Sequence, residues 1–191
     1  HLATADDVEQ DDFTREQIAR YDEISSQLTA ALPYRVIRHT AASAAMERFE
    51  EARFDMCRLG LGLYGFDYYR NEALTPVATL KARVVQIKRL DAPETVGYGR
   101  AGQLSRPTVT ATVSIGYADG LNRRLGNGHA YCLVNGQKAP YVGNICMDVC
   151  MIDVTDIDCQ EGDKVIIFGE DLPVTTLAEV LETIPYEILT S

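Results

Sequence analysis

The chain has 191 residues, with 18 Lys and Arg against 28 Asp and Glu, and therefore a formal net charge of −10. This acidic balance argues against a nucleic-acid partner, because proteins that bind polyanions need clustered basic residues. No apolar run reaches the roughly 18 residues of a membrane-spanning helix, and the N-terminal residues lack the basic and apolar stretches of a secretory signal. The length exceeds an average domain of about 150 residues but falls short of a complete eight-stranded α/β barrel of about 250.

The five cysteines are odd in number and lie mostly within apolar runs. This usage is typical of free thiols in a reducing compartment, so we predict a cytoplasmic protein. The cysteines and histidines do not have the spacing of a zinc ribbon, and we expect no metal site.

The first part of the chain alternates helical and short apolar patterns. An amphipathic helix is predicted by apolar residues that recur along one face: Phe13, Ile18, Tyr21, Ile24 and Leu28. A short strand is predicted over 34–38, a second helix begins in the small residues 41–45, and a further apolar stretch covers 54–64. Alternation of helix and strand is typical of βα units with parallel strands.

The rhythm changes near residue 76. Strands are predicted over 78–90, 108–115, 130–134, 139–142, 146–154 and 164–168, and a helix over 176–183. Asn135-Gly136 is a strong hairpin signal. We therefore predict a mixed α/β and β fold, with a partial α/β domain over 1–75 and a mostly β C-terminal domain over 76–191. Because a parallel strand needs helices on both sheet faces or barrel closure, we expect residues 1–75 to begin in the middle of a domain.

Two segments of the first part could hold an anion. Ser43 lies among small residues where a helix begins after a strand, which suits a phosphate; a plain helix start explains the same residues. Arg58 lies in an apolar run beside Gly60, and an arginine there needs a partner or a ligand because burial of an unpaired charge is costly. A structural ion pair would also satisfy it.

Three segments of the second part could carry chemistry. Tyr98 lies between two glycines, so its hydroxyl could project into a cleft, although a surface turn fits equally well. Tyr117 ends a predicted strand just before a turn. Met147 and Asp148 begin another predicted strand and offer backbone donors and a carboxylate.

Taken in order, the segments FDMCRLGLGLYG, LKARVVQIKRL, VGYG, SIGYADG, VNGQKAP and ICMD resemble the alanine racemases, which are pyridoxal-phosphate enzymes. The resemblance implies that residues 1–75 are the C-terminal end of a (β/α)8 barrel. It implies an isomerase that interconverts L- and D-alanine for the peptides of the bacterial cell wall. It further implies a homodimer with active sites shared between subunits, a small amino acid as substrate, and no nucleic-acid or membrane partner.

The resemblance also assigns roles to individual residues. It places the cofactor phosphate near Ser43, Gly60, Leu61 and Tyr186. It places Arg58 at the pyridine nitrogen, with His1 supporting it. The catalytic tyrosine is Tyr98, the substrate-binding residues are Met147 and Asp148, and Tyr117 lines the substrate channel.

Racemisation needs an acid/base group on each side of the α-carbon, and the family uses a lysine and a tyrosine. A free phenol has a pKa near 10, so a tyrosine that acts as a base near neutral pH needs a nearby cation or hydrogen bond. An arginine at the pyridine nitrogen does not give up its proton. The ring is then a weaker electron sink, which suppresses side reactions.

The chain departs from the family pattern at several places. Its lysines are Lys81, Lys88, Lys138 and Lys164, and none lies in a motif like that of the family's cofactor-binding lysine. We therefore expect this chain alone to be inactive. Ala42 and Asn144 stand where many members have Asn and Arg, so the channel should be less positive. Two alternatives remain: a racemase of other or broader specificity, such as serine or lysine, and a non-catalytic dimerisation or docking β domain of a larger fusion protein.

Overall fold

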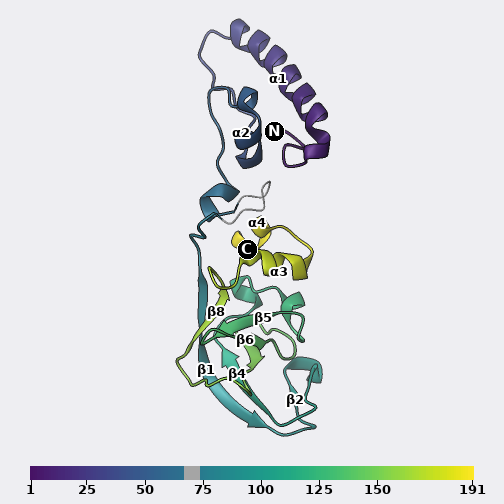
Figure 1. Ribbon diagram of the computed structural model, residues 1–191, viewed down its shortest axis with the longest axis vertical. Coiled ribbons are helices and arrows are strands. Elements are labelled where there is room, and N and C mark those ends of the chain that lie inside the picture. Colours follow the sequence, from purple (N-terminus) through teal and green to yellow (C-terminus); the bar gives the residue numbers. More distant parts are fainter. Residues whose placement is uncertain (67–73) are drawn as a thin grey trace. The chain divides into compact units, whose positions relative to one another are not determined.

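The computed structural model describes residues 1–66 and 74–191. The chain divides into two compact units, His1–Val77 and Ala78–Ser191, and their elements are labelled in Figure 1. None of the helices in the described residues is both long enough and apolar enough to cross a bilayer.

The first unit is built from helices and extended segments. Its elements are the 3₁₀-helix η1 (Val8–Gln10), α1 (Asp11–Ala31), α2 (Ser43–Arg48), and the 3₁₀-helices η2 (Glu50–Ala52) and η3 (Leu61–Tyr64). Seven of its buried apolar residues form one cluster: Leu2, Ala5, Ile18, Ala41, Ala45, Phe49 and Ala52. The predicted second helix therefore exists and contributes Ala45 to this cluster.

The helix α1 forms where the sequence predicted one, but only Ile18 of its five recurring apolar residues is buried. The buried face also includes Thr14 and Ser25, whose hydroxyls are satisfied within the unit. Thr14 Oγ1 bonds to Thr4 Oγ1 at 2.9 Å, and Ser25 Oγ accepts from the Arg38 guanidinium at 3.3 Å. Small hydroxyl side chains let the helix approach its neighbours closely, and they cost little when they are hydrogen-bonded.

The predicted strands of the first unit are also wrong, since residues 1–66 contain no β-strand of two or more residues. The extended segments 34–41 and 54–60 do run side by side. The Asp55 N–H donates to the Arg38 carbonyl at 3.1 Å and the Arg58 N–H to the Ala41 carbonyl at 2.9 Å. These bonds are spaced by three residues rather than by the two of a regular ladder, so the segments are not strands.

The second unit is dominated by an antiparallel sheet. Its strands are β1 (Leu80–Leu90), β4 (Thr108–Val113), β5 (Tyr131–Val134), β6 (Gln137–Pro140), β7 (Cys150–Asp153) and β8 (Lys164–Phe168). Their spatial order is β6-β5-β8-β1-β4-β7. A separate hairpin pairs β2 (Thr95–Val96) with β3 (Gly102–Gln103). The mixed α/β character of the chain and the β-rich second part agree with the sequence.

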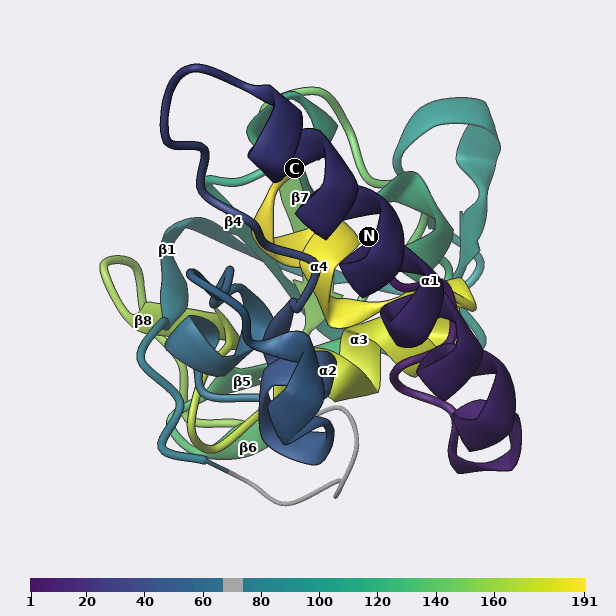
Figure 2. The same ribbon diagram turned by 90° about the horizontal axis from the view of Figure 1, so that it is seen from above.

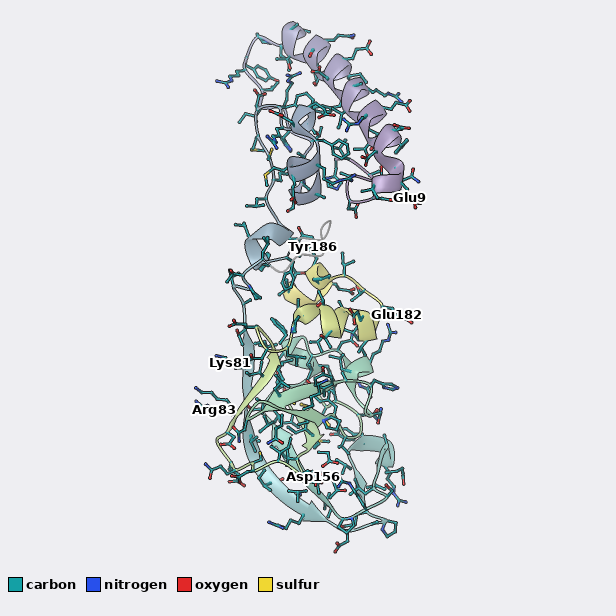
Figure 3. The ribbon with its side chains drawn as sticks, viewed as in Figure 1. Glu9, Lys81, Arg83, Asp156, Glu182 and Tyr186 are labelled. Atoms are coloured by element: carbon teal, nitrogen blue, oxygen red, sulfur yellow. The ribbon has the colours of Figure 1, made fainter. Side chains whose placement is uncertain are left out.

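The long strand β1 joins the two halves of the sheet. Its first residues pair with β8 and its last residues with β4, with a register shift between Val84 and Gln86. Ala82 and Val84 are buried, while Lys81 and Arg83 point away from the strand into solvent (Figure 3). This alternation is typical of a strand with one face in the core and one in solvent.

Five of the six predicted strands differ from the observed ones in at least one limit, and β6 and β7 differ at both ends. Asn135 and Gly136 have φ of +49° and +76°, as a two-residue hairpin turn requires, so Gln137 pairs directly with Val134. The strand β6 therefore begins at Gln137 rather than at residue 139. The strand β7 begins at Cys150 rather than at residue 146, because residues 146–149 form a loop that bonds to another turn.

Two helices, α3 (Val174–Leu181) and α4 (Pro185–Leu189), follow the sheet and pack together. Figure 2 shows them as neighbours in a second view. Helix α3 buries Val174, Leu177 and Leu181. It replaces the predicted helix over 176–183 and begins slightly earlier.

The two fully buried cysteines should resist thiol reagents in the folded protein. Burial, followed by the neighbouring Cys146, raises the pKa of Cys150 to about 12, and burial also raises the pKa of Cys132. At about pH 8 almost none of either thiol is the reactive thiolate. We expect iodoacetamide, followed by mass spectrometry, to modify the partly exposed Cys57 first and the buried pair only in urea. Labelling of Cys150 as fast as Cys57 without urea would contradict this packing.

Candidate active site

Ser43 and Gly60 meet on the surface of the first unit. The N–H of Gly60 donates to Ser43 Oγ at 3.0 Å. Ser43 begins α2, whereas Gly60 precedes η3, so the contact joins the two segments that the sequence singled out. Because the hydroxyl oxygen accepts this bond, its own proton remains available, and residues 1–66 and 74–191 provide no acceptor for it. An anion could take that proton.

Arg58 is exposed rather than buried, because the apolar run around it lies at the surface, where Met56 and Leu59 are also exposed. Its partner is the ring of His1, with Arg58 Nη2 2.6 Å from His1 Nδ1. A guanidinium has only donors, so a hydrogen bond between them has Nδ1 as its acceptor. The structure thus joins the two residues that the family resemblance pairs.

Tyr98 lies at the tip of the β2–β3 hairpin, in the 3₁₀-helix η4 (Tyr98–Arg100). Gly97 and Gly99 on either side have φ of +78° and +66°, which glycine adopts without strain. The tyrosine side chain is 75% exposed. The flanking glycines therefore place the phenol on an exposed surface turn, which is the alternative to the cleft that the sequence also allowed.

Tyr117 and Met147 are brought together by backbone bonds between two loops. The Tyr117 N–H donates to the Cys146 carbonyl at 2.9 Å and the Ala118 N–H to the Met147 carbonyl at 3.0 Å. The side chains of Tyr117 and Met147 are both exposed. Within the described residues, the N–H groups of Met147 and Asp148 have no acceptor and could bind a carboxylate.

The second unit separates Tyr186 from Tyr98. Tyr186 lies on α4 (Figure 3), at the opposite end of this unit from the β2–β3 hairpin (Figure 1). The predicted site residues therefore form one set in the first unit around Ser43 and Arg58, a second set around Tyr98 and Met147, and a separate position at Tyr186.

Sequence reasoning did not predict the contacts by which three polar residues hold these loops, although it placed Asn144 at the channel. Asp119 Oδ2 accepts from the Gly116 N–H at 2.9 Å and fixes the turn that carries Tyr117. Asn144 and Asn127 bond to each other through their side chains at 3.0 Å. An acidic residue three positions after the start of a turn can bond back to the N–H at that start, so the contact of Asp119 is a local one. No local pattern connects Asn127 with Asn144.

Comparison with known families covers both units. The model of the alanine racemase C-terminal domain matches residues 77–191, and the model of the alanine racemase N-terminal domain matches residues 1–67. The chain belongs to the alanine racemase family.

Individual members of the family match the whole chain. Alanine racemase 1 of Clostridium acetobutylicum is 38% identical and covers 99% of this chain, and the alanine racemase of Desulfosudis oleivorans is 39% identical and covers 100%. The chain spans about half the length of these relatives, 51% of each.

A solved structure has the same fold. The crystal structure of the Bartonella henselae alanine racemase, which holds covalently bound pyridoxal phosphate, superposes with a TM-score of 0.85 at 36% identity. It covers 100% of this chain, and the chain covers 52% of it.

The close packing of the Tyr117 turn against the Met147 loop should make Gly116 intolerant of a side chain. A Cβ on Gly116 would overlap the carbonyl of Met147, although its φ of −144° suits any residue. We expect Gly116→Ala to lower the free energy of unfolding by about 3 kcal/mol, because the obstructing atoms belong to the backbone.

The matched control is Gly128→Ala. Gly128 has φ of +78° and open space around it, so only backbone strain of about 1–2 kcal/mol is expected there. Urea unfolding of both variants measures the difference, and an equal or smaller loss for Gly116→Ala would argue against the close packing.

Proposed function

We propose that this chain is part of an enzyme that racemises alanine with pyridoxal phosphate, and that it supplies D-alanine for cell-wall peptides. Two contacts in a chain of this family carry the proposal: the bond between Ser43 and Gly60, and the bond between Arg58 and His1. The five unpaired thiols of the described residues fit the cytoplasmic location expected from the sequence.

The residues of the first unit suit pyridoxal phosphate. Its phosphate needs hydrogen-bond donors, and the free hydroxyl proton of Ser43 supplies one. Gly60, Leu61 and Tyr186 complete the proposed phosphate-binding set. The pyridine nitrogen needs a donor, which the guanidinium of Arg58 provides, held by its contact with His1. When bound, the cofactor supplies an electron-withdrawing ring that acidifies the α-hydrogen of an attached amino acid.

The remaining roles fall to residues of the second unit. The exposed phenol of Tyr98 takes or returns a proton at the α-carbon of the substrate. The free N–H groups of Met147 and Asp148 donate to the substrate carboxylate, and Tyr117 lines the channel beside them. Arg58 keeps its own proton, because a guanidinium does not release it at physiological pH.

We also propose that residues 1–75 form the last βα units of a (β/α)8 barrel and that residues 76–191 form the C-terminal β domain. The two bonds from 55–58 to 38–41 support this arrangement. In both bonds the residue numbers rise together, so the segments run in the same direction, as neighbouring barrel strands do.

The separation of Tyr98 from Tyr186 supports a homodimer with shared sites. One β domain places these two tyrosines at opposite ends, so it cannot direct both at one substrate. In a dimer, Tyr98 would serve the site of the partner subunit, while Ser43 and Arg58 serve their own.

Ser43→Ala should weaken binding of pyridoxal phosphate in the natural protein that carries this chain. Loss of one hydrogen bond to a charged group costs about 1.5–3 kcal/mol, which corresponds to a Kd about 10- to 100-fold higher. Fluorescence titration of the cofactor-free protein measures it. Pyridoxal without the phosphate is the control ligand, and an equal loss of affinity for both ligands would place Ser43 away from the phosphate.

Tyr98→Phe tests the activity itself. Removal of an acid/base group lowers the rate by about 10²–10⁴-fold, so we expect racemisation of alanine to fall by that amount while the dimer stays intact in analytical ultracentrifugation. Unchanged turnover together with a weakened dimer would instead support a docking role for the β domain.

A further inference from the structure

One side-chain amide joins the two loops that carry the proposed catalytic and substrate-binding residues. The Nδ2 group of Asn144 donates to the backbone carbonyl of Tyr98 at 3.1 Å. Asn144 belongs to the same loop as Met147 and Asp148, and it is half-buried. The position of Tyr98 is therefore coupled to the loop that we expect to hold the substrate carboxylate.

The base of the Tyr98 hairpin is anchored by close backbone packing. A Cβ on Gly143 would lie 2.6 Å from the carbonyl oxygen of Val96, and one on Gly102 would lie 2.9 Å from the N atom of Gly143. The backbones of residues 96 and 102 are thus in direct contact with the loop that contains Gly143. This packing holds the two ends of the turn but not its tip.

The tip of the hairpin depends on Asn144. The bonds that Arg100 makes, from its N–H to the Gly97 carbonyl and from Nε to Thr95 Oγ1, stay within the hairpin. In the part of the chain that the structure describes, the Asn144 amide is the one group outside the hairpin that bonds to the backbone of residues 97–101. Gln103 Nε2 also donates to the Arg100 carbonyl at 2.6 Å, again within the hairpin. Loss of the Asn144 bond would therefore leave the turn closed on itself but no longer tied by a hydrogen bond to the loop that carries Met147.

A second asparagine orients the Asn144 amide. Asn127 Nδ2 donates to Asn144 Oδ1 at 3.0 Å, and the Asn127 N–H donates to the Gly143 carbonyl at 2.8 Å. The Tyr98 carbonyl can only accept, so the group facing it must be the Asn144 nitrogen, and the Asn144 oxygen must then face a donor. Each donor in this network therefore faces an acceptor: Asn127 donates to Asn144, and Asn144 donates to the Tyr98 carbonyl. This pairing keeps the Asn144 amide from flipping.

We propose that Asn144 is a positioning residue for Tyr98, and that Asn127 acts through it. This inference rests on the proposed catalytic role of Tyr98. Proton transfer requires the phenol oxygen within about 3 Å of the group it serves, and a displacement of about 1 Å can cost 10²-fold in rate. The amide of Asn144 therefore affects catalysis without touching the substrate.

Two variants of Asn144 in the natural protein test the proposal. Asn144→Leu removes both bonds, and Asn144→Asp keeps an acceptor for Asn127 but turns an oxygen toward the Tyr98 carbonyl. We expect each to lower kcat at least tenfold, with KM for alanine within twofold in the uncharged Asn144→Leu variant. We also expect faster amide hydrogen exchange of peptide 96–103 in both variants. Asn127→Gly keeps the left-handed backbone at that position and should have a smaller effect.

The matched control is Asn135→Asp. Asn135 Nδ2 also donates to a backbone carbonyl, that of Asp158 at 2.8 Å, but at the β5–β6 turn. We expect it to lose stability while kcat and the exchange of peptide 96–103 stay at wild-type values. If this control lost as much kcat as the Asn144 variants, the effect of Asn144 would be one of general stability. That result would overturn the proposal.

A double variant separates this inference from the proposed function. If Asn144 acts through Tyr98, Asn144→Leu should lower kcat by less than twofold when added to Tyr98→Phe. A further tenfold loss would overturn the positioning role alone. Full activity of Tyr98→Phe would overturn the proposed function, whereas wild-type kcat in Asn144→Leu, with Tyr98→Phe impaired, would overturn only this inference.

Discussion

The candidate site of the second unit depends on backbone segments that touch without side chains between them. Gly116 lies against the Met147 carbonyl, Gly143 against the Val96 carbonyl, and Gly102 against Gly143 itself. A methyl group at any of these positions would separate two loops that must adjoin. Close main-chain contact is rigid, because neither side can move aside as a flexible side chain would. The three loops that carry Tyr98, Tyr117 and Met147 therefore behave as one surface.

This constraint explains why the residues with proposed chemical roles are so exposed. Main-chain packing fills the space between the loops, so the side chains of Tyr98, Tyr117 and Met147 project outward. An exposed tyrosine with no hydrogen bond from its hydroxyl would normally adopt several positions. Here the glycines fix the ends of the Tyr98 turn, and the Asn144 amide fixes its tip. A rigid surface with outward-pointing groups suits a site that is completed by another surface, which is the arrangement that the proposed shared-site dimer requires.

The sequence predicted the second unit better than the first, and the reason lies in the range of the interactions. Strand β8 lies over the predicted residues, and the Asn135-Gly136 turn forms as expected, because alternation and turn chemistry are local signals. The strands of the first unit fail, because a strand exists only through its ladder, and segments 34–41 and 54–60 share just two backbone–backbone bonds of irregular spacing. The helix α1 forms as predicted, but the buried positions on it include the hydrogen-bonded hydroxyls of Thr14 and Ser25, which hydrophobic periodicity does not reveal.

The candidate site shows the same limit at the level of single residues. Glycine-flanked Tyr98 and the apolar run around Arg58 were visible as unusual patterns, and the family resemblance assigned their roles. The contact that holds Tyr98 was not visible, because its acceptor is a backbone carbonyl, which every residue possesses. Its donor lies 46 residues away, and the donor's own partner lies 17 residues from it. A neutral amide at Asn144 also adds no charge to the channel. Its effect on Tyr98 is therefore geometric: it limits where the phenol can lie and leaves the charge around it unchanged.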